Sequence, residues 1–276
     1  MQKILSLNQV SEYTDYLDDQ MIGYLETRQT ETFEDFENFD LMAFDLYYEH
    51  PNETENPQIL IYIDHEDLFI FCSDSQSFNR CTSLLPSGQS NEKALYLFFV
   101  NLLKNDNKHL DDYETEIVSS ENEALHAQKA DFLTDVYEYR KNLLHLKQYY
   151  GELNMIMDNL TANDNELLSR DAVRSFTIIL NRVERFYTCV TNLWDYVTQM
   201  REACQSQLDL EQNNLMRIFT VVTGVFTPLM LIAGWYGMNF KFMPELGWKY
   251  GYIYVIVLTL AIFGGLLVYF KHKKWF

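Results

Sequence analysis

Residues 213–240 read NNLMRIFTVVTGVFTPLMLIAGWYGMNF, and this stretch decides the fold. Its part 218–235 carries no charged residue and approaches the ~20 residues that a helix needs to cross a hydrocarbon core about 30 Å thick. A second uncharged stretch, 250–270, follows after a short link. Two such runs close together predict two membrane-spanning helices rather than core helices of a soluble protein.

Charge predicts the orientation of the two spans. Four basic residues follow the second span directly, as the positive-inside rule expects of a cytoplasmic end: Lys271, His272, Lys273 and Lys274. The link 240–249 then lies outside, where Trp248 and Tyr250 suit the membrane interface. Residues 1–10 lack the basic and apolar parts of a signal peptide. We therefore expect a multi-pass protein of the plasma membrane with both termini in the cytoplasm.

The sequence before the first span is strongly acidic. Up to Asn214 it has 39 acidic and 15 basic residues, net −24, whereas the remainder is net +5. Such a charge repels nucleic acid and attracts cations. No phosphate-binding glycine loop, nucleophile elbow or HExxH motif is present, so we expect no enzyme. The cysteines form no zinc-type cluster and predict reduced thiols without a structural metal: Cys72, Cys81, Cys189 and Cys204.

Strands are predicted before helices in this acidic part. Residues 58–62 and 67–72 read as a hairpin around the turn Asp64-His65-Glu66. The acidic run 31–40, with phenylalanines at a spacing of three, predicts an amphipathic helix with a solvated acidic side rather than a cation-binding face. From Asn91 onward the periodicity is helical. The longest predicted helix, 170–239, would be on the order of 100 Å long at 1.5 Å per residue.

A polar stripe runs along the first predicted span. At heptad spacing one face presents seven residues: Asn213, Met216, Thr220, Thr223, Thr227, Met230 and Gly234. All three threonines of the span fall on this stripe, and the other faces carry mainly Ile, Phe, Val and Leu. In lipid, a polar stripe is either a helix–helix contact or the wall of an aqueous path. The residues alone leave both interpretations open.

The residues after the stripe resemble a known family. Gly237, Met238 and Asn239 form the Gly-Met-Asn signature of CorA transporters, at the outer end of the first of two closing spans. The resemblance is strong over roughly the last quarter of the chain and extends to further positions: Asn213, Met216, Pro228, Leu229, Ala233, Gly234, 243–246, Trp248, Gly251 and 273–276. One departure is Met230, because members commonly carry threonine directly after the Pro-Leu pair.

The resemblance implies a funnel-shaped homopentamer in which the first span lines a pore. Gly237, Met238 and Asn239 would then form the ion filter, with a ring of Asn239 amide oxygens suited to hydrated Mg²⁺, which prefers oxygen ligands and sheds water reluctantly. Met216 and Phe219 would form a hydrophobic inner gate. Glu245 in the outer loop would concentrate cations near the mouth, or would merely keep the loop soluble.

The expected fold class is an α+β cytoplasmic domain followed by long stalk helices and two transmembrane helices. The expected domains are an acidic α/β domain with a helical second half at 1–165, a stalk helix at 166–214, a pore-lining helix at 215–239, an extracellular loop at 240–249, a second span at 250–270 and a basic tail at 271–276.

The expected function is potential-driven influx of hydrated Mg²⁺. The resemblance implies that intracellular Mg²⁺ also closes the channel between neighbouring domains, at ligands that the sequence leaves unassigned. Candidates are Asp171, Glu184 and the segment 131–138. Two alternatives remain open. One is transport of Zn²⁺, Co²⁺ or Ni²⁺, with or without proton coupling, and the other is a membrane-anchored sensor that conducts nothing.

Overall fold

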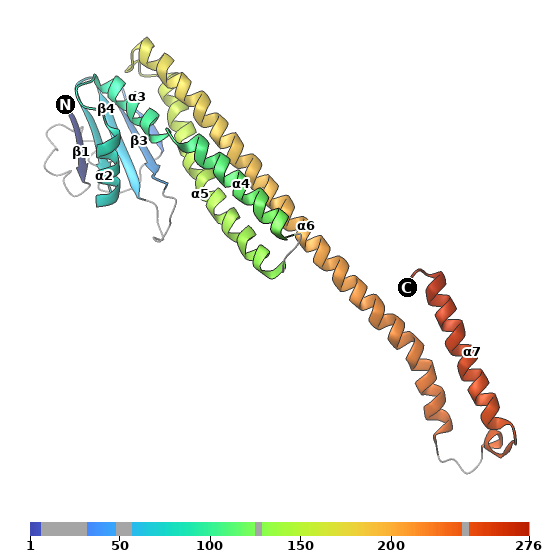
Figure 1. The fold of residues 1–276 in the computed structure, drawn as a ribbon. Helices are drawn as coiled ribbons and strands as arrows, with labels where there is room; N and C mark the ends of the chain where they lie inside the picture. Colours follow the sequence, from blue (N-terminus) through green and yellow to red (C-terminus); the bar gives the residue numbers. More distant parts are fainter. Residues whose placement is uncertain (7–31, 48–56, 125–128, 239–242, 276) are drawn as a thin grey trace. The chain divides into compact units, whose positions relative to one another are not determined.

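The computed structural model of this chain describes residues 1–6, 32–47, 57–124, 129–238 and 243–275 (Figure 1). The chain forms two compact units, an N-terminal unit, Met1–Arg201, and a C-terminal unit, Glu202–Phe276. In the described residues of the N-terminal unit every strand precedes every helix, which confirms the α+β class.

The strands of the N-terminal unit form one five-stranded sheet in the order β1-β5-β4-β3-β2. β1 runs parallel to β5, and the other neighbours are antiparallel. β4 and β5 are buried almost throughout, which explains why their central sequences, 59–63 and 68–72, are continuous apolar runs rather than alternating ones. The strands are β1 Gln2–Ser6, β2 Phe33–Asp35, β3 Phe39–Asp45, β4 Gln58–Asp64 and β5 Leu68–Cys72.

The predicted hairpin is confirmed as the antiparallel pair β4 and β5, with Ile63 opposite Leu68. Its turn is held by a side chain. The Asp64 carboxylate accepts the backbone N–H groups of Glu66 at 2.7 Å and Asp67 at 2.6 Å. This is the local bonding that makes aspartate a turn residue.

The helix predicted for the acidic run 31–40 is wrong. From residue 33 the chain forms β2, a turn and the start of β3. The N–H of Phe36 donates to the carbonyl of Phe39 at 2.9 Å, and the two rings stack with centroids 4.4 Å apart. Phe39 also packs against Tyr62 of β4 at 5.1 Å. Packing against the sheet outweighs the helical spacing of the phenylalanines, because strand formation depends on such tertiary contacts.

The helices are α2 Ser75–Leu84, α3 Asn91–Leu102, α4 Asp106–Ala124, α5 Lys129–Ala162, α6 Arg170–Tyr236 and α7 Gly251–His272, with one 3-10 turn, η3 Pro244–Gly247. The helical periodicity predicted from Asn91 is confirmed. α2 was not predicted, although Asp74 caps it by accepting the N–H of Ser77 at 2.6 Å. A capping box between Asp74 and Ser77 marks where it begins.

The longest predicted helix is confirmed by the 67 residues of α6. Within the N-terminal unit α6 buries one apolar face against α3 and α5. Phe176 meets Tyr96 with ring centroids 6.2 Å apart, and Phe186 meets Tyr150 at 5.5 Å. These contacts recur along the helix and stabilise it beyond its own propensity.

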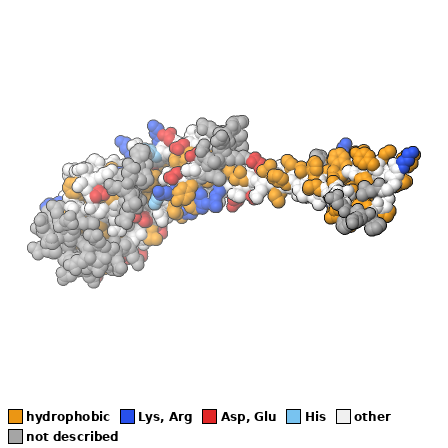
Figure 2. Space-filling view, turned by 90° about the horizontal axis from the view of Figure 1, so that it is seen from below, with side chains coloured by type: hydrophobic (Ala, Val, Ile, Leu, Met, Phe, Trp, Pro, Cys, Tyr) orange, Lys and Arg blue, Asp and Glu red, His pale blue; other side chains and the backbone are white. Residues whose placement is uncertain are grey.

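In the C-terminal unit the end of α6 packs against α7. Val221 and Val225 of α6 and Phe270 of α7 form a buried cluster. A Cβ at Gly224 would lie only 3.0 Å from Cζ of Phe270, so glycine lets the ring approach the α6 backbone. Among the described residues, α6 and α7 are the helices long and apolar enough to cross a membrane. Figure 2 shows hydrophobic side chains over much of the visible face of this unit.

The Gly224 contact yields a first expected result. Gly224→Leu places a side chain where the Phe270 ring lies, and overpacking of this kind costs about 1–3 kcal/mol of unfolding free energy. The unfolding midpoint in detergent micelles should therefore fall. Phe270→Ala in the same chain should recover part of the loss, because the two residues share one contact. If the losses of unfolding free energy in Gly224→Leu and in Phe270→Ala simply add in the double variant, the contact does not hold these helices together.

Candidate ion pathway

The polar stripe on α6 faces away from α7. All seven residues predicted to share this stripe are exposed in the single chain, with Met216 59% and Met230 66% exposed. On the same helix, Val221 and Val225 are 4% exposed because they contact α7. At about 100° of rotation per residue, the stripe lies roughly opposite that buried face. The stripe is therefore available to water or to another copy of α6.

One threonine hydroxyl of the stripe shows what this face can offer an ion. Thr220 Oγ1 donates to the carbonyl of Met216 at 2.8 Å, one turn earlier in the helix. The hydrogen is thus used inside the helix, and the oxygen lone pairs remain able to accept. Water molecules around a hydrated Mg²⁺ ion are hydrogen-bond donors. A wall of such acceptors can therefore contact the hydrated ion without stripping it.

The predicted inner gate is an exposed apolar segment. Phe219 is 65% exposed and Met216 59%. Their neighbours Leu210 and Leu215 are similarly exposed, at 63% and 57%. Surface of this kind on one helix marks contact with other chains or with lipid.

The predicted filter is described only in part. Asn239 lies outside the described residues, so its role stays a prediction. Gly237 follows the last turn of α6, and its N–H donates to the carbonyl oxygen of Ala233 at 2.9 Å. A Cβ at Gly237 would lie 2.9 Å from that same backbone oxygen. Any other residue at position 237 would require the backbone to shift. Glycine therefore determines the path of the backbone directly after α6.

The predicted outer loop contains η3, which includes Glu245, a residue whose side chain lies outside the description. Beyond it, Trp248 meets Tyr250 and Tyr254 with ring centroids 6.3 and 6.1 Å apart. An aromatic cluster at a helix start is typical of a membrane–water interface.

The described acidic candidates for a regulatory site form no cluster that could hold a metal ion. Asp171, Glu184 and Glu138 are each exposed, and the side chain of Asp131 is outside the description. Among the described residues no group of three or more His, Cys, Asp or Glu side chains is placed to hold a metal ion.

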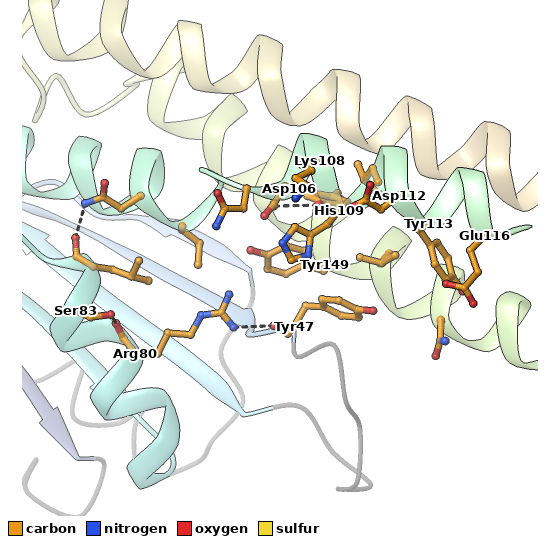
Figure 3. Close-up of a pocket in the computed structure, with 18 residues that line it drawn as sticks. Tyr47, Arg80, Ser83, Asp106, Lys108, His109, Asp112, Tyr113, Glu116 and Tyr149 are labelled. Carbon is orange, nitrogen blue, oxygen red and sulfur yellow. Dashed lines mark hydrogen bonds between the residues drawn. The ribbon is translucent and has the colours of Figure 1, made fainter.

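A cavity of about 860 Å³ in the N-terminal unit was not foreseen from the sequence (Figure 3). Arg80 donates to the carbonyl of Tyr47 at 3.0 Å on one side, and Tyr150 donates to Asp106 at 2.9 Å on the other. Burial raises the pKa of Asp106. The described lining holds three acidic and three basic side chains, so it lacks the excess of carboxylates that suits a divalent cation: Asp106, Asp112, Glu116, Arg80, Lys108 and His109.

These features define a class, a membrane protein with two apolar helices and one α+β domain, in which the long helix carries a polar stripe. Residues 7–272 match the family described as CorA-like Mg²⁺ transporter protein, and the chain belongs to this family.

Two relatives show how the likeness is distributed. The cobalt/magnesium transport protein CorA of Thermotoga maritima is 30% identical over 166 residues, which is 60% of this chain and 47% of that protein. The magnesium transport protein CorA of Mannheimia succiniciproducens is 41% identical over 97 residues, 35% of this chain and 31% of that protein. The alignments thus span less than half the length of either relative.

Two solved structures share the fold. The CorA magnesium transporter from Methanocaldococcus jannaschii matches with a TM-score of 0.75 at 19% identity, over 98% of this chain and 87% of that one. The full-length CmaX protein matches with a TM-score of 0.76 at 13% identity, over 99% of this chain and 88% of that one. The α+β domain, the long helix and the terminal apolar helix recur together in the CorA fold.

Proposed function

We propose that this chain is a subunit of a homopentameric channel that conducts hydrated Mg²⁺ into the cell. The observation that carries the proposal is the exposed stripe on α6, opposite the face that α7 covers. Five such stripes facing one axis would make a polar path lined by threonine hydroxyls. Membership of a family described by Mg²⁺ transport supports the choice of ion.

The driving force is the membrane potential. Each elementary charge gains about 2.3 kcal/mol per 100 mV. A divalent ion entering a cell that is negative inside gains about twice that, which needs no separate energy source. In this proposal both termini are cytoplasmic, because the basic residues after α7 are retained on that side.

Closure is assigned to intracellular Mg²⁺ bound between N-terminal units of neighbouring subunits. The net charge of −24 before the first span makes adjacent acidic faces repel until a divalent ion bridges them. Co²⁺ is a second candidate cargo, because the name of the Thermotoga relative includes cobalt.

Cysteine substitution along α6 tests the pore wall. Thr223→Cys lies on the stripe, and its neighbour Val222→Cys is also exposed in the single chain but lies off the stripe. In membranes, a cationic water-soluble thiol reagent should modify the cysteine at 223 and reduce Mg²⁺ influx, whereas the cysteine at 222 should react slowly. Both are compared with the unsubstituted chain, in which Cys72 and Cys81 are buried.

Magnesium itself supplies the second part of this test. Excess Mg²⁺ should slow modification at residue 223, because the ion occupies the same path. Equal reaction at residues 222 and 223, insensitive to Mg²⁺, would mean that the stripe does not line the path of the ion.

A further inference from the structure

The connection between α5 and α6 is tied to the sheet by one side chain. Asn165 Nδ2 donates to the carbonyl of Phe36 at 2.8 Å and to Oδ1 of Asp40 at 2.7 Å. Phe36 and Asp40 belong to the turn between β2 and β3 and to the start of β3. α6 begins at Arg170, five residues after this tie. The tie therefore anchors the start of the helix that carries the polar stripe.

The rest of this connection, residues 163–169, is held internally. Asn163 donates to the carbonyl of Leu168 at 3.0 Å and accepts its N–H at 2.9 Å. Ser169 donates twice to Glu92, through its N–H and its hydroxyl, both at 2.7 Å. Residues 163–169, called the corner below, are thus held in one conformation by hydrogen bonds of their own. The corner contacts the β2–β3 turn and the start of β3 through Asn165.

The surroundings of Asp40 disfavour a negative charge. The side chain is 2% exposed and faces a small cavity. The described residues that line this cavity carry three carboxyl groups and three amides but no basic side chain: Phe33, Asp35, Asp40, Asn159, Asn163, Asp164 and Asn165. A buried carboxylate without a cation is costly, and the usual escape is to bind a proton.

Each described element packed around Asp40 either adds to the cost of a negative charge on Asp40 or leaves that cost unchanged. β2 places Asp35 directly opposite Asp40 in the strand pairing, and the corner contributes Asp164. On β4 the residue opposite is Ile63, which is apolar. α5 contributes Asn159, which is neutral.

We infer that Asp40 is a proton-binding site that sets how firmly the corner before α6 is held against the sheet. When Asp40 is ionised, it keeps the Asn165 hydrogen bond but is repelled by Asp35. When it binds a proton, the repulsion ends and the new hydroxyl can donate to a neighbouring amide or carboxylate oxygen. A lower pH on the side where the N-terminal unit lies therefore strengthens the contact between the corner and the sheet, and a higher pH weakens it.

The sign of the pH dependence follows from the pKa. Burial raises the pKa of Asp40 from 3.8 to about 6, against the lowering effect of the Asn165 hydrogen bond, and Asp35 raises it further. Asp40 thus binds a proton more tightly when the corner contacts the sheet than when the corner has detached from it. The corner gains stability as the pH falls through about 6, and the gain is complete below 3.8.

Hydrogen–deuterium exchange of the full-length protein in detergent micelles tests this inference. Between about pH 7.5 and 5.5, corrected for intrinsic exchange, protection of the amides at 166–170 should rise about fourfold in the wild type. Asp40→Asn keeps an acceptor for Asn165 but cannot titrate, so its protection should be high and independent of pH. Asp158→Asn removes an exposed carboxyl from α5 and should behave as the wild type.

A second variant keeps the inference testable if Asp40→Asn does not fold. Asp35→Asn removes the repelling charge, so the pKa of Asp40 falls and the rise in protection moves to lower pH. The inference is overturned if the wild type shows no pH dependence or if Asp40→Asn keeps it. It is also overturned if Mg²⁺ at neutral pH protects the corner in the wild type but not in Asp40→Asn, because the cavity would then bind a metal ion. None of these readouts uses transport, so the result is independent of the proposed channel.

Discussion

Asn239→Ala is expected to reduce Mg²⁺ influx on the order of a hundredfold or more. Each lost hydrogen bond to the ion's water shell is worth about 0.5–1.5 kcal/mol. In the proposed pentamer five subunits would lose one each, about 2.5–7.5 kcal/mol together, at about 1.4 kcal/mol per tenfold change. The measurement is the initial rate of Mg²⁺ uptake into proteoliposomes that contain an indicator dye.

Two further variants make this result specific to the filter. Asn181→Ala removes an exposed asparagine of α6 in the N-terminal unit, whose amide donates only within its own helix in the described contacts, to Thr177 at 2.8 Å. Its uptake should match the wild type. Gly237→Ala should also abolish uptake, because its Cβ would lie 2.9 Å from the Ala233 oxygen and displace the start of the filter. Normal uptake in both Asn239→Ala and Gly237→Ala would remove the filter from these residues.

Opening the inner gate should have the opposite effect. Replacing both Met216 and Phe219 by asparagine makes the predicted constriction polar, so that water no longer leaves it. We expect uptake that persists when Mg²⁺ is already high inside the liposome, where wild-type uptake stops. The measurement is the uptake rate as a function of internal Mg²⁺.

Ile218→Asn is the matched control for the gate. Ile218 is 57% exposed, close to the 59% of Met216, but it lies off the polar stripe. The same change of polarity there should leave closure intact. If Ile218→Asn abolishes closure as the double variant does, the effect comes from polarity near the membrane and not from a constriction at Met216 and Phe219.

Long, strongly patterned elements were predictable from the sequence alone. α6 begins at Arg170 as predicted and ends three residues before the predicted end. The β4–β5 hairpin follows from an alternation of apolar runs and one turn residue, Asp64. These elements are determined by residues that are close together in the sequence, so local sequence patterns predict them.

Elements decided by distant contacts were not predictable. The run 31–40 has helical spacing, but Phe39 packs on Tyr62 across the sheet and the run forms strands. α2 spans only ten residues with few large apolar side chains, so its periodicity gave no clear signal. The proton site at Asp40 depends on Asn165, which lies 125 residues away in sequence. No local pattern brings these two side chains together.

The residues of the candidate site could be proposed from the sequence, but their assembly could not. The stripe on α6 follows from heptad spacing, and its members are exposed in the single chain. The number of subunits, the ion and the role of Asn239 come from the family resemblance and stay predictions. A single chain holds one fifth of the proposed wall, so its own contacts cannot close the pore.

The most direct test of the central claim uses wild-type protein in liposomes without ATP and without a pH gradient. A potassium diffusion potential, negative inside, is imposed while internal Mg²⁺ is followed with a dye. Conduction driven by the potential should give uptake that rises as the potential becomes more negative and that vanishes when the potential is collapsed. Absence of uptake with verified pentamers, or uptake that ignores the potential and requires a proton gradient, would contradict a passive Mg²⁺ channel.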